Sequence, residues 1–155
     1  MLEPGDRIPV ARVWCAPRED PVELAEALAG EGFALLCFYP FDWSPTCTNE
    51  LLLLRDRADD LVAARIRAFG ISRDSPWSHA AWASTMGTEN VTLLSDWSGE
   101  ATRGFGVAFE LQGMTEVSAR SAFLIEGDTV RASWLLGRDL PDVDAVIAAS
   151  SSPAP

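Results

Sequence analysis

The stretch Phe33–Leu51 reads F-A-L-L-C-F-Y-P-F-D-W-S-P-T-C-T-N-E-L and decides how the chain folds. Its first part, Phe33–Tyr39, is a continuous apolar run between a glycine and a proline, which predicts a central strand buried on both faces. A helical pattern follows, with Cys47 at its start. A cysteine at a helix start meets unpaired backbone N–H groups and the positive end of the helix dipole, which stabilise the reactive thiolate. The stretch therefore predicts a reactive thiol beside a buried strand.

The composition is that of a globular chain with a strongly acidic balance. The chain has 155 residues, of which 48% are apolar, and it carries 12 arginines, no lysine and 23 carboxylates, for a formal net charge of −11. These values predict one folded domain over residues 1–149, and the S-S-S-P-A-P end predicts a disordered tail over 150–155. Nucleic acid and anionic membranes are not expected partners, because both are bound through clustered basic residues.

The cysteines and the N-terminal residues indicate a reduced, cytoplasmic protein. The N-terminus lacks the charged and apolar regions of a signal peptide, and no apolar run approaches the roughly 18 residues of a membrane span. Cys15, Cys37 and Cys47 are then expected to be free thiols. Cys37 lies inside the apolar run and predicts a core thiol. The cysteine spacings and the single His79 do not fit a zinc site, and no metal or other cofactor is expected.

Strand and helix patterns alternate along the rest of the chain. Strand patterns cover residues 8–14, 33–39, 67–72, 91–94, 121–125 and 129–135, and helical patterns cover 21–29, 47–64, 76–86, 99–105 and 142–149. Asp20 precedes a proline and is predicted to cap the first helix. Alternating units that end in an antiparallel hairpin predict a three-layer α/β/α domain with a central mixed sheet. Cys47 would lie at the C-terminal edge of that sheet, where such folds bind ligands.

Four positions around Cys47 could take part in chemistry. Ser44 is predicted either to cap the helix or to reach the sulfur or a peroxide oxygen, and the two roles are compatible. Pro45 suits the first helical position, which leaves the N–H groups of Thr46 and Cys47 for an oxygen substrate. Pro40 either ends the strand or shields the thiolate from water. The functional interpretation of Cys47 is favoured over a buried helix thiol because of its place at the helix start.

The loop Pro40–Cys47, P-F-D-W-S-P-T-C, resembles the peroxiredoxin signature Pro-x-x-x-Thr/Ser-x-x-Cys. The likeness continues in order through D-S-P-W-S-H-A-A-W-A, L-L-S-D and A-R-S-A-F-L-I, and so covers residues 32–135. The chain is most similar to bacterial one-cysteine peroxiredoxins of the alkyl hydroperoxide reductase E or bacterioferritin-comigratory type. The resemblance implies a thioredoxin-like fold and the reduction of hydroperoxides by a thiol.

The resemblance also assigns roles to individual residues. Cys47 matches the peroxidatic cysteine, Ser44 the hydroxyl that binds peroxide, and Pro40 the shielding proline. Arg120 matches the arginine that faces the thiolate, and Glu50 the acid that helps to hold this arginine. From the residues alone, Arg120 is an ordinary strand-end cation and Glu50 an ordinary first-turn acid. The implied product is a sulfenic acid on the cysteine.

One departure from the family pattern concerns the step that resets the cysteine. Position 52 is Leu52, where many bacterioferritin-comigratory proteins carry a resolving cysteine. The sulfenic acid is therefore expected to be reduced by an external thiol, either a small thiol or a thioredoxin-like protein. Cys15 is the alternative, as a resolving partner across a homodimer, which is itself only a family expectation.

Three other functions use the same residues. A redox sensor would form the same sulfenic acid without turnover. A thioredoxin-like oxidoreductase would need a cysteine at Ser44, because S-P-T-C lacks the first thiol of a C-x-x-C motif. A Cys-His hydrolase would need His79 as its base, but we interpret His79 as a surface helix histidine between tryptophans.

Overall fold

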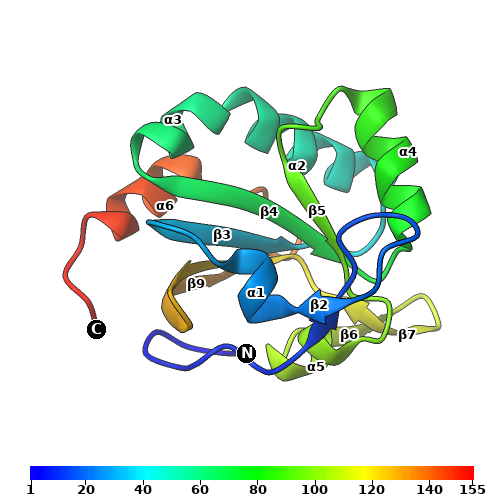
Figure 1. Cartoon of the computed structure of the whole chain (residues 1–155), viewed down its shortest axis with the longest axis horizontal. Helices are drawn as coiled ribbons and strands as arrows, with labels where there is room; N and C mark the ends of the chain where they lie inside the picture. The colour runs from blue at the N-terminus through cyan, green and yellow to red at the C-terminus, as the bar shows by residue number, and fades with distance from the viewer.

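The computed structural model describes all 155 residues, arranged as nine strands and six helices (Figure 1). The strands are β1 (Arg12–Val13), β2 (Val22–Glu23), β3 (Phe33–Phe38), β4 (Ile66–Ser72), β5 (Thr92–Ser95), β6 (Ala108–Leu111), β7 (Met114–Ser118), β8 (Ser121–Glu126) and β9 (Thr129–Leu135). The helices are α1 (Leu24–Leu28), α2 (Pro45–Asp56), α3 (Ala58–Ala63), α4 (Pro76–Met86), α5 (Glu100–Gly104) and α6 (Val143–Ser150). None of these helices combines the length and apolar content needed to cross a bilayer.

A five-stranded mixed sheet organises the molecule, with strands in the order β5-β4-β3-β8-β9. Strands β3, β4 and β5 run parallel, whereas β8 pairs antiparallel with both β3 and β9. The stretch Phe33–Tyr39 therefore supplies the central strand, as its unbroken apolar run predicts. The predicted mixed sheet with a terminal antiparallel hairpin is confirmed.

Side chains of β3 alternate between two hydrophobic cores, one on each face of the sheet. Ala34, Leu36 and Phe38 point into the core that is closed by α1 and α5. Leu35 and Cys37 point into the other core, which is closed by α2, α3, α4 and α6. Figure 1 shows α2, α3 and α4 on one face and α1 and α5 on the other. This arrangement confirms the three layers, and it places Cys37 on the same face of the sheet as α2.

The predictions for the N-terminal region are largely wrong. The expected strand over residues 8–14 is only Arg12–Val13, and the expected helix over 21–29 begins as the strand β2. The N-cap of α1 is Glu23, without a side-chain cap, so Asp20 does not cap it. The cause is tertiary pairing, because Val22 pairs with Val13 and overrides the local helix preference.

The expected helix over residues 47–64 starts earlier and is divided in two. Helix α2 begins at Pro45, and Arg57 separates α2 from α3. After this break Leu61 is buried, whereas the neighbouring Val62 is 68% exposed. Helix α6 runs to Ser150, one residue beyond the predicted end. Disorder in the tail stays a prediction.

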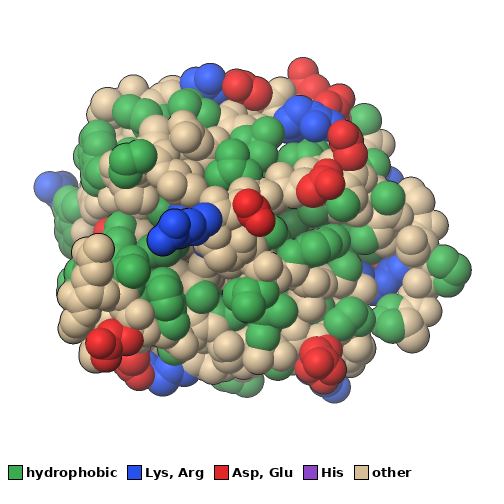
Figure 2. All heavy atoms as spheres, turned by 180° about the vertical axis from the view of Figure 1, so that it is seen from behind, with side chains coloured by type: hydrophobic (Ala, Val, Ile, Leu, Met, Phe, Trp, Pro, Cys, Tyr) green, Lys and Arg blue, Asp and Glu red, His purple; other side chains and the backbone are tan.

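The sequence interpretation also missed the hairpin of β6 and β7. Gln112 and Gly113 join its strands, with φ of 51° and 83°, as a primed hairpin turn requires. Most of its residues are exposed, so they carry no buried apolar pattern. Figure 2 shows part of the molecular surface from behind, where acidic and basic side chains lie scattered among apolar ones without a basic patch on that face.

Candidate active site

The first turn of α2 fixes the position of Cys47. Ser44 is the N-cap, and its Oγ accepts a hydrogen bond from the Cys47 N–H at 3.3 Å. Pro45 occupies the first helical position, where its missing N–H costs nothing. Only the N–H of Thr46 therefore remains for a substrate, and the expectation that the Cys47 N–H is also available is wrong. The Ser44 hydroxyl keeps its own proton for donation.

Arg120 contacts both the thiol of Cys47 and the carboxyl of Glu50, although it is remote from both in sequence. It immediately precedes β8, the strand beside β3 in the sheet. Its Nη2 donates to the Cys47 Sγ at 3.2 Å, and its Nη1 pairs with the Glu50 Oε2. Cys47, Glu50 and Arg120 are 1%, 2% and 5% exposed. The structure thus brings together the thiol, the cation and the acid that the resemblance singled out.

Burial dominates the electrostatics of this triad. It raises the pKa of the Glu50 carboxyl to about 7, and Arg120 offsets only part of the rise. Burial also acts against the charged form of Arg120, but Glu50 and Cys47 outweigh it and raise the guanidinium pKa. The cation therefore stays protonated against the sulfur. Glu50 Oε1 and Arg120 Nε are buried without a hydrogen-bond partner in the chain.

We expect the stability of the protein to fall as Glu50 ionises. The folded carboxyl titrates at about 7 and the ordinary one at 4.5, so its contribution is complete below 4.5 and is lost as the pH rises through about 7. Between these two pH values, the free energy of unfolding measured in urea should fall for the wild type. For a Glu50→Gln variant it should fall by up to about 3 kcal/mol less. The control is a Glu110→Gln variant at an exposed position. An unchanged pH dependence in the Glu50→Gln variant would contradict the assignment.

A small cavity lies behind the thiol. Its volume of about 10 Å³ is the space of roughly one water molecule. Its lining residues are Cys37, Tyr39, Cys47, Glu50, Leu51, Leu54, Gly70 and Trp82. Cys37 is fully buried, and burial raises its pKa well above that of an ordinary thiol. It is the core thiol that its place in the apolar run predicts, and Trp82 is likewise a core residue.

The remaining predicted residues have different surroundings. Pro40 is half-buried in the loop after β3, and its role as a shield stays a prediction. Thr46 is half-buried in the first turn of α2. Cys15 is exposed, although partial burial and the nearby Glu19 and Glu26 raise the pKa of its thiol. It lines a groove that does not include Cys47.

His79 contradicts its interpretation as a surface histidine, because only 4% of it is exposed. Its Nδ1 lies 2.8 Å from the Asp42 Oδ2, and its Nε2 lies 3.1 Å from the Leu94 carbonyl oxygen. Both ring nitrogens are therefore engaged away from Cys47, and the structure offers no Cys-His pair for a hydrolase. The sequence interpretation also missed Asp42. A signal was available, because Asp42 is a charged residue in the short loop between the apolar run and Cys47.

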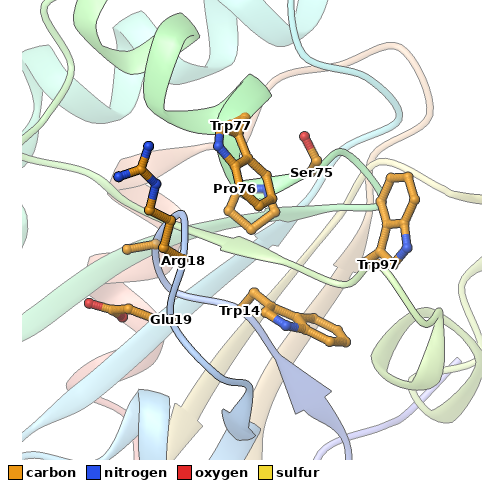
Figure 3. A pocket seen from close by; sticks show the side chains of 8 residues that line it. Trp14, Arg18, Glu19, Ser75, Pro76, Trp77 and Trp97 are labelled. Carbon is orange, nitrogen blue, oxygen red and sulfur yellow. The ribbon is translucent and has the colours of Figure 1, made fainter.

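A separate groove of about 500 Å³ opens near the start of α4 (Figure 3). Trp14, Trp77 and Trp97 surround it, and Arg18 lies at its side. Trp77 and Trp97 are among the most exposed large apolar side chains of the chain. No residue that contacts the Cys47 sulfur lines this groove, so it is not the reacting centre.

Comparison with known proteins shows the family of the chain. Residues 4–133 match the model of the AhpC/TSA family. The chain belongs to this family, the peroxiredoxins. It is 32% identical over 115 residues to the mitochondrial thioredoxin-dependent peroxide reductase of Mus musculus, a match that covers 70% of this chain and 43% of the relative. It is 31% identical over 107 residues to the chloroplastic 2-Cys peroxiredoxin BAS1 of Spinacia oleracea, covering 65% and 39%. The chain thus spans about two fifths of the length of these curated relatives.

Solved peroxiredoxin structures match nearly the whole chain. Peroxidoxin BcpB from Mycobacterium tuberculosis is 27% identical, with a TM-score of 0.79 and 97% of both chains covered. Reduced Prx3 from Vibrio vulnificus in complex with hydrogen peroxide is 22% identical, with a TM-score of 0.84 and coverage of 97% and 100%. These likenesses confirm the predicted thioredoxin-like fold. The one-cysteine subtype stays a prediction.

Proposed function

We propose that this peroxiredoxin is a thiol-dependent peroxidase that reduces hydroperoxides through Cys47. The observation that carries the proposal is the 3.2 Å contact between Arg120 Nη2 and the Cys47 Sγ in the first turn of α2. A buried guanidinium and a helix N-terminus both favour the thiolate, which is the nucleophilic form of cysteine. The name of the mouse relative, a peroxide reductase, supports the same activity.

The reaction follows from the groups at the sulfur. The Cys47 thiolate attacks one oxygen of the peroxide, an S–O bond forms and the O–O bond breaks. Negative charge then develops on the leaving oxygen, where the Arg120 guanidinium, the Thr46 N–H and the Ser44 hydroxyl stabilise it. That oxygen takes up a proton and leaves as water or an alcohol. The sulfur is oxidised to a sulfenic acid while the peroxide is reduced.

We further propose a one-cysteine cycle that an external thiol completes. Position 52 is Leu52 and not a cysteine, Cys37 is buried, and Cys15 lines a groove that does not include Cys47. A first external thiol would condense with the sulfenic acid and release water, and a second would displace Cys47 as a free thiol. The names of the mammalian relatives support a thioredoxin-like reductant. Cys47 is 1% exposed, so a protein reductant requires movement of the first turn of α2.

One equivalent of hydroperoxide added to the reduced protein tests both proposals. Mass spectrometry of the trapped product should show one added oxygen on Cys47, as a sulfenic acid. A disulfide from Cys47 to Cys15 or Cys37 would refute the one-cysteine cycle but keep the peroxidase. An unmodified Cys47 would refute the peroxidase itself. Continued peroxide consumption with excess thiol would separate the enzyme from a redox sensor, which should react once and stop.

A further inference from the structure

A group of buried polar side chains beside the site is unused by the reaction above. Asp42 lies in the loop between β3 and α2, and its side chain is 0% exposed. His79 lies in α4, and its side chain is 5% exposed. The Asp42 Oδ2 and the His79 Nδ1 are 2.8 Å apart. Burying two such polar side chains costs free energy unless they are hydrogen-bonded, so their partners decide what the pair can hold in place.

The Asp42 carboxylate accepts hydrogen bonds from side chains of two different segments. The Tyr39 hydroxyl donates to its Oδ1 at 2.7 Å, and the Ser78 hydroxyl donates to its Oδ2 at 2.7 Å. Tyr39 follows β3, whereas Ser78 and His79 lie in α4. Burial, with Asp42 nearby, raises the Tyr39 pKa well above its ordinary value, so the hydroxyl keeps its proton for this bond. The carboxylate therefore ties the loop to α4.

The other nitrogen of His79 fixes the direction of the ring. A carbonyl oxygen only accepts, so the contact of 3.1 Å from Nε2 to the Leu94 oxygen requires a proton on Nε2. The Nδ1 then shares a second proton with Asp42, either as an imidazolium–carboxylate pair or with the proton on the carboxyl. In both cases, His79 bridges the loop to β5 with no unsatisfied ring nitrogen.

The backbone of the same loop is held in an unusual conformation. Trp43, between Asp42 and Ser44, has a φ of 70°, which a bulky residue rarely adopts. Its side chain is 51% exposed, so burial of the indole does not explain this conformation. The Asp42 N–H donates to the Asp74 Oδ2 at 3.0 Å, which fixes the residue before the turn. The loop thus reaches Ser44 through a strained turn anchored on its N-terminal side.

We propose that Asp42 and His79 are positioning residues, which hold the Pro40–Cys47 loop so that Ser44 and the first turn of α2 are aligned for peroxide. This proposal rests on the proposed function. None of the Asp42 or His79 hydrogen bonds reaches Cys47, so the pair acts through the loop. Loss of the anchor should displace Ser44 and the Thr46 N–H, while the pair with Glu50 keeps Arg120 beside the sulfur.

Two substitutions of Asp42 test this role. Asp42→Ala removes the anchor. Asp42→Asn keeps its shape, because the amide oxygen can accept from Tyr39 while the amide nitrogen donates to a neutral His79. Two rate constants should be measured for each variant, one with hydrogen peroxide and one with iodoacetamide, which needs the thiolate but not the aligned loop. Asp59→Ala, at an exposed position of α3, is the control.

We expect Asp42→Ala to lower the peroxide rate constant about 100-fold, the scale of a small misplacement of reacting groups, and to leave alkylation nearly unchanged. Asp42→Asn should stay much closer to the wild type than Asp42→Ala does, and the control should match the wild type. Equal loss of both reactions in Asp42→Ala, or an unchanged peroxide rate, would overturn the proposal. So would a loss in Asp42→Asn as large as in Asp42→Ala.

Failure of Asp42→Ala to fold would not end the test. Tyr39→Phe combined with Ser78→Ala removes two donors while the Asp42–His79 pair remains, and it should lower the peroxide rate constant about tenfold at unchanged alkylation. A wild-type peroxide rate in this double variant would overturn the proposal. A wild-type protein that does not react with peroxide would instead refute the proposed function itself, and the positioning role with it.

Discussion

Replacing Cys47 by serine should lower hydroperoxide consumption by roughly 10⁴-fold or more, on the scale of removing a covalent nucleophile. A serine hydroxyl stays protonated beside Arg120, and its oxygen cannot accept an oxygen atom as sulfur does. The substitution is nearly isosteric, and the first turn of α2 keeps its Ser44 cap. Steady-state peroxide assays with excess thiol, together with far-ultraviolet circular dichroism, would measure activity and fold in the same samples.

The other two cysteines are the matched controls for this experiment. Cys15→Ser alters an exposed position, and Cys37→Ala removes a core sulfur without burying a new hydroxyl. Both variants should consume peroxide at close to the wild-type rate under the one-cysteine cycle. Normal turnover by the Cys47→Ser protein would contradict the proposed function. A Cys15→Ser variant that still reacts once with peroxide but loses continued turnover would instead identify Cys15 as the resolving thiol.

Local sequence patterns predicted the parts of the site that depend on neighbouring residues. The apolar run Phe33–Tyr39 required burial on both faces, and the structure places it at the centre of the sheet. Ser44 and Pro45 indicated a helix start before Cys47, and both occupy the expected cap positions. These features follow from strand burial and helix capping, which act over a few residues.

The remaining parts depend on contacts between distant segments. Arg120 and Glu50 are 70 positions apart, and no periodicity connects them, so only the family resemblance suggested their pairing. His79 follows Trp77 in a segment without a clear polar face, and its partner Asp42 lies 37 positions away. Without that partner in view, a lone helix histidine favoured the surface interpretation. The helix predicted over residues 21–29 was partly wrong for the same reason, because the pairing of β2 with β1 overrode the local helix propensity.

Replacing Arg120 by methionine should lower the rate constant for hydrogen peroxide by about 10²- to 10³-fold, the scale of losing one preorganised donor at a developing oxyanion. In the proposed reaction the guanidinium has two roles, since it contacts the Cys47 Sγ and would donate to the leaving oxygen. Arg120→Lys should retain only part of the rate, because an ammonium ion cannot present the planar, forked donors that reach both Cys47 and Glu50. Stopped-flow measurements and the ultraviolet absorbance of the thiolate would separate loss of nucleophile from loss of transition-state stabilisation.

Glu50 makes the Arg120→Met variant ambiguous unless it is changed as well. Loss of the arginine leaves a carboxyl that is 2% exposed without its partner, and an unpaired buried polar group of this kind lowers stability. The double variant Arg120→Met with Glu50→Gln removes that carboxyl, so we expect it to recover stability but not the peroxide rate. Recovery of both would show that Arg120 serves only to neutralise Glu50. Recovery of stability without recovery of the peroxide rate would place the guanidinium in the chemical step.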